Sequence, residues 1–242
     1  MLNSKLILSF SLAAVILVAL AGPVLGVQYS PGVTPGQYMK YGNFVGSGIG
    51  YEYFNDLSFL NLQIVSVSGS SVTLLNTDEF KNGTALPGNG TTDVWDVSTG
   101  TDNGTSTTQG PIIAANLNQG DAIPPPNTYL INQTVDRIYL GTVRSVNILN
   151  VTVSTPDYNT TTNYVYDKLS GMFLETTSTT VTQPQPKVVT STYSYSITSS
   201  NIFGSAGPSP TIPEFNPQII LLVLAITMIG IAAITISQRT RH

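Results

Sequence analysis

The sequence contains no cysteine, and the only histidine among its 242 residues is His242, the last one. Neither a disulfide nor a thiolate metal site can therefore form. The body of the chain also lacks an imidazole for a Ser-His or Cys-His catalytic pair or for a zinc site. Eukaryotic extracellular domains usually carry disulfides, so this composition fits a prokaryotic surface better. We expect no cofactor, no metal and no enzymatic activity.

Charge is scarce too, at 9% of residues, and positive charge is the scarcer sign. Between residues 27 and 212, six basic side chains stand against twelve acidic ones, a net charge of −6. No cluster of cations occurs there. Because nucleic-acid binding needs a basic footprint, this composition excludes nucleic acid as a partner.

Long apolar runs occur only near the two ends of the sequence. Residues 218–237 read QIILLVLAITMIGIAAITIS, without a charge. As a helix, twenty residues extend about 30 Å, the thickness of a bilayer core. The tail over residues 238–242 carries Arg239 and Arg241, which fits a cytoplasmic flank. We predict a transmembrane helix; the alternative, a buried core helix, would usually be amphipathic.

The N-terminal run covers residues 6–20 and follows Lys5. Small residues at 19–21, and more weakly at 24–26, offer cleavage sites, so residues 1–26 are predicted to be a signal peptide. An uncleaved N-terminal anchor is the alternative. Together the two runs predict a single-pass protein of the cell membrane with an extracellular ectodomain.

Directly before the C-terminal run stand Pro213, Glu214 and Phe215. The tripeptide, the apolar run and the basic tail together resemble the Pro-Glu-Phe C-terminal sorting signal of archaeal surface proteins. The resemblance implies that an archaeosortase cuts near the tripeptide and transfers the protein to a membrane lipid. A sortase-like enzyme, membrane lipid and other envelope proteins are thus the expected partners. A retained transmembrane anchor is the alternative.

The region between the runs has the pattern of an all-β ectodomain. Residues 57–68 alternate Leu60, Leu62 and Ile64 with polar residues, and residues 72–80 return after a Gly-Ser turn. Further strands are predicted at 91–97, 143–153, 162–167, 172–180 and 188–199. We expect an antiparallel meander, closed into a sandwich or an open barrel, over residues 27–182 with a last strand at 183–199. A Pro- and Ser-rich stalk should follow at 200–217.

Two short motifs in this region carry a second resemblance. Gly32 and Gly36 are followed by Gln37 and Tyr38, and a late Tyr-Asp-Lys-x-x-Gly hairpin covers residues 166–171. The combination is similar to poorly characterised secreted archaeal proteins, although Gln37 stands where those have Asp. The resemblance implies a β-rich fold and no particular activity. In the hairpin turn, Gly171 is expected to take the left-handed conformation.

Six Asn-x-Thr sequons predict a glycoprotein. Four of the asparagines fall in predicted loops, where a glycan would be solvated, whereas the one at position 150 lies in a strand and must face outward. The candidates are Asn82, Asn89, Asn103, Asn132, Asn150 and Asn159.

Acidic residues gather in one loop region, at Asp93, Asp96 and Asp102, beside Asn103. Such oxygen ligands suit Ca²⁺, but the spacing is not that of a known calcium loop, and Asp and Asn are common in turns. As carboxylate pairs for a glycoside hydrolase, residues 93 and 96 or 78 and 79 are nearest in sequence. Residues three apart in a strand point to opposite faces, which weakens the first pair.

Glycine and tyrosine patterns complete the candidates. Residues 46–50 (GSGIG) are predicted to bend the backbone rather than cradle a phosphate, because the following residues 51–54 are strand-like. Tyrosines form near-alternate pairs at 38/41, 51/53, 164/166 and 193/195. They are expected to be core residues whose hydroxyls reach the rim; a groove that stacks sugars is the sharper hypothesis.

The expected function is a non-enzymatic structural or binding role in the cell envelope. The alternative is a carrier for a lipid or small apolar ligand in a half-barrel pocket, which an apolar cavity of several hundred Å³ would favour. A carboxylate-dependent glycoside hydrolase is a third hypothesis, and it requires two acids facing each other across a cleft.

Overall fold

The computed structural model describes residues 29–106, 110–124, 129–182 and 188–204. The predicted signal peptide, the sorting tripeptide Pro213 to Phe215, the apolar run at 218–237 and the basic tail lie outside these residues. Within the described part of the chain, no helix combines the length and the apolar character needed to cross a membrane.

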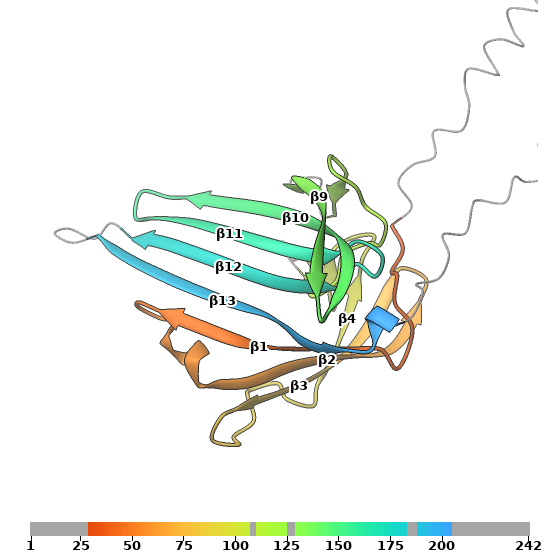
Figure 1. Ribbon diagram of the computed structural model, residues 1–242, viewed down its shortest axis with the longest axis horizontal. Coiled ribbons are helices and arrows are strands. Elements are labelled where there is room, and N and C mark those ends of the chain that lie inside the picture. Colours follow the sequence, from red (N-terminus) through yellow and green to blue (C-terminus); the bar gives the residue numbers. More distant parts are fainter. Residues whose placement is uncertain (1–28, 107–109, 125–128, 183–187, 205–242) are drawn as a thin grey trace, which may run out of the picture. The chain divides into compact units, whose positions relative to one another are not determined.

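Thirteen strands and two short 3₁₀-helices make up the described fold (Figure 1). In chain order they are β1 (Tyr38–Ser47), η1 (Glu52–Asp56), β2 (Leu57–Ser68), β3 (Ser71–Phe80), β4 (Thr92–Asp96), β5 (Thr101–Asp102), β6 (Thr105–Ser106), β7 (Ala122–Ile123), β8 (Tyr129–Leu130), β9 (Gln133–Tyr139), β10 (Thr142–Ser154), β11 (Tyr158–Asp167), β12 (Phe173–Thr182), β13 (Val189–Ser200) and η2 (Ile202–Gly204). The prediction of an all-β protein is confirmed.

Eleven of these strands form one antiparallel sheet in the order β6-β5-β4-β3-β2-β1-β13-β12-β11-β10-β9. It consists of two meanders, β1 to β6 and β9 to β13, joined where β1 pairs with β13. Met39 lies opposite Ser200 in that pair, so the first and last strands of the fold are neighbours. The short β7–β8 hairpin stands apart from the sheet.

The best-predicted strands are those with clean two-residue alternation. β2 has the predicted bounds 57–68, and its Ile64 is buried between exposed neighbours. β1 and β9 were not predicted as strands. β1 is interrupted by register shifts around Asn43, which has a φ of 53°, and β9 carries Asp136 and Arg137 within seven residues. Both features hide the pattern that sequence reasoning depends on.

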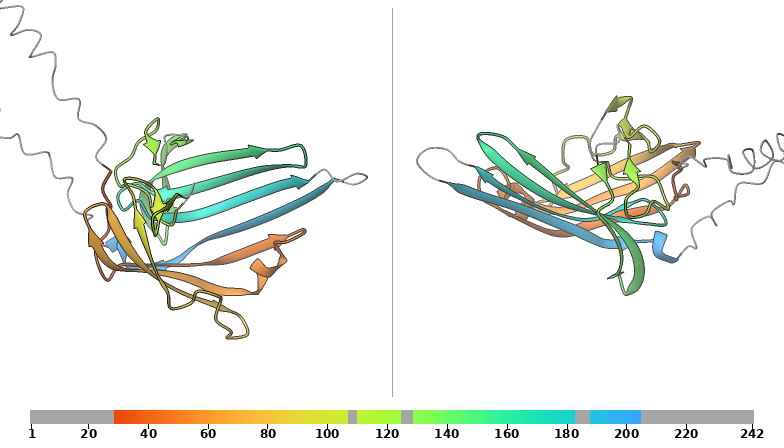
Figure 2. Two further views of the ribbon diagram at one scale, coloured as in Figure 1. Left: turned by 180° about the vertical axis from the view of Figure 1, so that it is seen from behind. Right: turned by 90° about the horizontal axis from the view of Figure 1, so that it is seen from above.

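The segment over residues 110–123 lies on one side of the curved sheet, called here the inner face, beside the β11–β12 turn (Figure 2). A small hollow of about 10 Å³ is lined by Trp95 from β4, Leu149 and Tyr166 from β10 and β11, and Ile112 and Ile113 from the segment. Opposite halves of the sheet thus share one core. Backbone hydrogen bonds tie the segment to the β11–β12 turn, including Ile113 N to Gly171 O at 2.9 Å and Asn116 N to Lys168 O at 2.7 Å.

The two motifs of the second resemblance meet at this turn. Gly32 N donates to Ser170 O at 3.3 Å, and a Cβ on Gly32 would lie 2.0 Å from Leu169 O. Gly171 has a φ of 76°, so the predicted left-handed glycine is confirmed. Gln37, where Asp was expected, is buried and accepts a hydrogen bond from Thr34 N at 2.7 Å.

One local prediction was wrong. Residues 51–54 were expected to be strand-like, but Tyr51 follows a turn and Glu52–Asp56 forms η1. Gly48 and Gly50 both have positive φ and reverse the chain, so the predicted glycine bend is confirmed. Asn55 then bridges Gly46, accepting from its N–H at 2.9 Å and donating to its carbonyl at 2.7 Å. These local bonds favour a turn over continued strand pairing.

The folded part also extends further than the predicted start of the stalk. Ser200 ends β13, Ile202 in η2 is buried, and Phe203 packs against the core. Residues 200–204 of the predicted stalk therefore belong to the folded part; residues 205–217 lie outside the described residues.

Candidate functional site: the inner face of the sheet

A continuous chain of aromatic rings runs along the inner face. Phe54 of η1 stacks on Tyr193 with ring centroids 4.8 Å apart. Tyr195 lies 5.6 Å from Phe173 and 5.9 Å from Tyr41. The series of rings continues from Phe173 to Tyr166, whose centroids are 5.6 Å apart, and Tyr166 is fully buried. Most of the inner face is therefore filled by its own side chains.

Burial makes these tyrosines hard to ionise. It raises the pKa of Tyr164 to about 12, with a smaller contribution from the neighbouring Tyr193. Burial likewise raises the pKa values of Tyr41, Tyr166 and Tyr195 well above the usual range. These tyrosines therefore stay protonated to a higher pH than an exposed tyrosine does.

Beyond the aromatic chain, hydroxyl side chains occupy the inner face in rows across three strands. Thr162 of β11, Ser178 of β12 and Tyr193 of β13 form one row by strand register, and Thr160, Thr180 and Ser191 form the next. The hydroxyls of Thr162 and Ser178 are 2.8 Å apart, and those of Thr160 and Thr180 are 2.9 Å apart. Each row is a ladder of groups that both donate and accept hydrogen bonds.

The outer row borders a hollow of about 170 Å³, called here the hydroxyl hollow. Its lining is Ile49, Tyr51, Thr180, Thr182, Val189 and Ser191. The Tyr51 hydroxyl lies 3.5 Å from Thr180 Oγ1, so the ring forms a wall of the hollow rather than part of the core. None of the lining residues carries a charge. The site can offer hydroxyl groups, one aromatic ring and two aliphatic side chains to a neutral ligand.

The predicted tyrosine pairs have different environments in the structure. Tyr41 and Tyr166 are buried core residues, as expected for most of the set. Tyr51 and Tyr53 do not share one face: Tyr51 contacts Tyr193 at 4.9 Å, whereas Tyr53 is 50% exposed. Of this pair, Tyr51 therefore lines the hydroxyl hollow and Tyr53 does not.

The acidic cluster divides into separate structural roles. Asp96 accepts hydrogen bonds from Ser98 N and Oγ at 2.8 and 2.7 Å, and those bonds lower its pKa. Asp93 instead accepts from the amides of Asn76 and Asn103. Burial, and then the charge of Asp93, raises the pKa of Asp102, so these two members of the predicted calcium cluster interact with each other.

Among the described residues, no three His, Cys, Asp or Glu side chains form a group that could hold a metal ion. For the other candidate pair, Asp78 accepts from Asn61 N at 3.1 Å and Glu79 is its direct neighbour on β3. Adjacent strand residues point to opposite faces. Within the described part of the chain, neither pair therefore faces a shared cleft.

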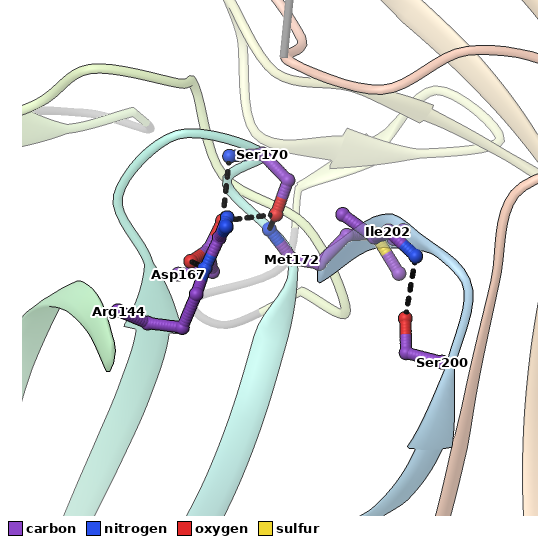
Figure 3. A network of polar contacts seen from close by, with 6 residues as sticks. All are labelled: Arg144, Asp167, Ser170, Met172, Ser200 and Ile202. Atoms are coloured by element: carbon purple, nitrogen blue, oxygen red, sulfur yellow. Dashed lines mark hydrogen bonds and ion pairs between the residues drawn. The ribbon is translucent and has the colours of Figure 1, made fainter. Parts of the chain in front are cut away.

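Asp167 of the second motif has a structural role (Figure 3). Its carboxylate accepts from Arg144 Nε and Nη2 at 2.7 and 2.8 Å, and from Ser170 N and Oγ at 2.8 and 2.7 Å. The pair is buried, and the guanidinium lies 4.9 Å from the Phe203 ring centroid. The ion pair therefore holds the β11–β12 turn and η2 against β10.

All six sequon asparagines are exposed, including Asn150 in the middle of β10. In five of them the side-chain oxygen accepts a hydrogen bond, and the Nδ2 atom donates none to another described residue. Those five are Asn82, Asn89, Asn132, Asn150 and Asn159. Asn103 differs, because its Nδ2 donates to Asp93 Oδ1 at 3.2 Å.

No protein-family model matches the chain. A comparison with curated proteins likewise gives no significant match.

The hydroxyl rows were missed by sequence reasoning, although a signal was present. Residues 158–162 and 174–182 are rich in threonine, and every second one falls on the inner face. Their alternation was read only as strand pattern. The pairing of β11, β12 and β13 brings together Thr160, Thr180 and Ser191. This register cannot be predicted from the sequence of each strand alone.

Proposed function

We propose that the protein is a membrane-anchored, single-pass cell-surface protein with an extracellular β-domain and a non-enzymatic role in the envelope. Its location is supported by the apolar run at residues 218–237, the Arg239 and Arg241 flank, and the N-terminal run. The resemblance at Pro213, Glu214 and Phe215 supports processing by a sortase-like enzyme as the route of attachment.

The location is tested by fractionating cells and measuring the intact mass of the mature protein. We expect the protein in the membrane fraction, and its domain degraded when intact cells are treated with protease. A mass that includes the C-terminal run indicates a retained helix; a mass lacking it but carrying a lipid indicates processing. Full-length, unmodified protein in the cytosol would overturn the proposal.

Within that role, we propose that the domain binds a neutral, hydroxyl-rich ligand such as an envelope glycan. The observation that carries this proposal is the hydroxyl hollow, where the Tyr51 ring stands beside Thr180, Thr182 and Ser191. Aromatic rings stack on the apolar faces of sugars, and hydroxyl groups match their polar edges. The hollow is smaller than the roughly 300–1,000 Å³ of small-molecule pockets, so it fits one ring of a longer ligand.

Binding is tested with the full chain in vesicles and a panel of neutral oligosaccharides. Tyr51→Ala should weaken binding at least about tenfold, the loss of roughly 1.4 kcal/mol. Tyr53→Ala is the matched control, because Tyr53 is exposed but does not line the hollow. Equal affinities for the two variants, or no binding by the unaltered protein, would contradict the proposal.

A carrier for a lipid or small apolar ligand is the second candidate, favoured by the curvature of the sheet (Figure 2). Two observations weigh against it: aromatic rings fill most of the inner face, and four of the side chains that line the hydroxyl hollow carry a hydroxyl group. A fluorescent fatty acid distinguishes the candidates. Saturable binding that neutral sugars do not displace would favour the carrier.

A further inference from the structure

The tip of the β9–β10 hairpin exposes three aliphatic side chains. Ile138 is 73% exposed, Val143 is 65% exposed and Leu140 is 45% exposed. Ile138 and Val143 are paired across the two strands, and Leu140 lies in the turn between them. The three side chains, called here the hairpin tip, form one local apolar cluster rather than scattered surface residues.

Leu140 is also an unfavourable choice for its backbone conformation. The turn consists of Leu140 and Gly141, with φ values of 50° and 78°. Such two-residue turns favour Asn-Gly, because Asn tolerates the left-handed conformation. A non-glycine residue there costs about 1–2 kcal/mol, and a bulky one is a genuine outlier. An exposed leucine at this position destabilises the fold without filling its core, which points to a role outside the fold.

The hairpin lies beside the point where the described chain ends. Arg144, one residue after Val143, places its guanidinium 4.9 Å from the Phe203 ring of η2. The right-hand view of Figure 2 shows the hairpin projecting beyond the rest of the sheet next to η2. From there, residues 205–217 lead to the predicted membrane segment at 218–237. At about 3.3–3.6 Å per residue, these thirteen residues span at most about 45 Å.

We propose that the hairpin tip inserts into the outer surface of the lipid bilayer and fixes the orientation of the domain on the membrane. This proposal rests on the proposed membrane anchoring. Apolar side chains at an interface bury about 5–10 Å into the boundary between headgroups and acyl chains, a depth that a hairpin tip can reach. The two basic residues behind the tip are already paired, Arg137 with Glu175 and Arg144 with Asp167. Insertion should therefore depend on apolar burial, not on anionic lipid or low salt.

The absence of cysteine permits a direct test. Ile138→Cys is labelled with the environment-sensitive dye NBD, and the full chain is reconstituted into phosphatidylcholine vesicles with or without nitroxide-labelled lipid. Val153→Cys is the matched control: Val153 is 43% exposed and lies near the other end of β10, away from the tip. We expect the dye at position 138 to be blue-shifted and quenched by the nitroxide lipid several-fold more than the dye at position 153, at both low and high salt.

A second variant separates insertion from a purely structural role. Leu140→Asn suits the turn but removes the apolar tip. In the Ile138→Cys background it should reduce quenching while raising the melting temperature. If Leu140 served only the fold, the melting temperature would fall instead.

Three outcomes would overturn the proposal. Equal quenching at positions 138 and 153 means that the tip stays in water, while anchoring itself stands. A blue shift that depends on protein concentration but not on nitroxide lipid means that a second copy covers the tip. A chain that does not float with the vesicles overturns both the anchoring and the insertion.

Discussion

Two ion pairs place the same chemistry in different environments. Arg144 and Asp167 are buried, whereas the side chains of Arg137 and Glu175 are 40% and 33% exposed. A buried charge that loses its partner retains the penalty of having left water, while an exposed one is solvated again. The two pairs should therefore respond very differently to the loss of one partner.

We predict that Asp167→Asn destabilises the fold by about 3–5 kcal/mol, because it leaves the Arg144 guanidinium buried and unpaired. Arg137→Gln should cost less than about 1 kcal/mol. Urea denaturation followed by the fluorescence of Trp95, the single tryptophan, measures both. Similar losses in the two variants would show that the Arg144 site is more hydrated than its burial implies.

The sequons allow a second prediction at this scale. Attachment of a glycan replaces one of the two hydrogens on Nδ2, and in Asn103 this atom already donates to Asp93, while φ is 47°. Glycopeptide mass spectrometry of the native protein should therefore find lower occupancy at Asn103 than at Asn82 or Asn89, which lie in exposed loops. Occupancy that is highest at Asn103 would contradict this reading of its contacts.

At the scale of elements, the β11–β12 turn packs closely against the segment over residues 110–123. A Cβ on Gly171 would lie 2.0 Å from Ile113 O, whereas a Cβ on Gly36, which also has positive φ, would meet nothing within 4 Å. The two glycines thus separate the effect of backbone conformation from that of close packing.

We expect Gly36→Ala to cost about 1–2 kcal/mol, the penalty of a left-handed residue with a Cβ. Gly171→Ala should lower the free energy of unfolding clearly more, because the segment over residues 110–123 must move away from the turn. Thermal unfolding of both variants gives the comparison. Equal losses would mean that the segment is loosely held.

The strands show which parts of the fold the sequence makes predictable. β2, β3 and the β11–β12 hairpin follow from alternation and turn residues, since these signals are local. The strand-like prediction for residues 51–54 was wrong, because η1 is stabilised by contacts outside it. Asn55 accepts a hydrogen bond from Gly46 N, and the Phe54 ring stacks on Tyr193. Predicting the hydroxyl hollow would have required the register of β11 to β13 and the position of Tyr51 beside these strands.

For the whole molecule, the shared aromatic core makes stability sensitive to alkali. An unfolded tyrosine ionises near pH 10, while burial raises the pKa values of Tyr139 and Tyr164 to about 12 in the folded state. The folded form holds these protons longer than the unfolded form. Stability from this source is complete below about pH 10 and is lost as pH rises through about 12.

We therefore predict that the urea midpoint falls between about pH 10 and 12. Tyr139→Phe should make this fall shallower, because it removes one of the responsible groups. An unchanged slope in Tyr139→Phe would show that other groups govern alkaline unfolding.

The pairing of β1 with β13 has a consequence for how the protein is made. Tyr41 lies opposite Ile197, so the partner strand of β1 is more than a hundred and fifty residues away in the sequence. During synthesis, the strands β1 to β6 can pair with one another early, but β1 keeps one unpaired edge until β13 has been made. Closure of the sheet at this seam therefore requires nearly the whole domain, and a chain that stops before β13 leaves the edges of β1 and β12 open to pairing with other chains.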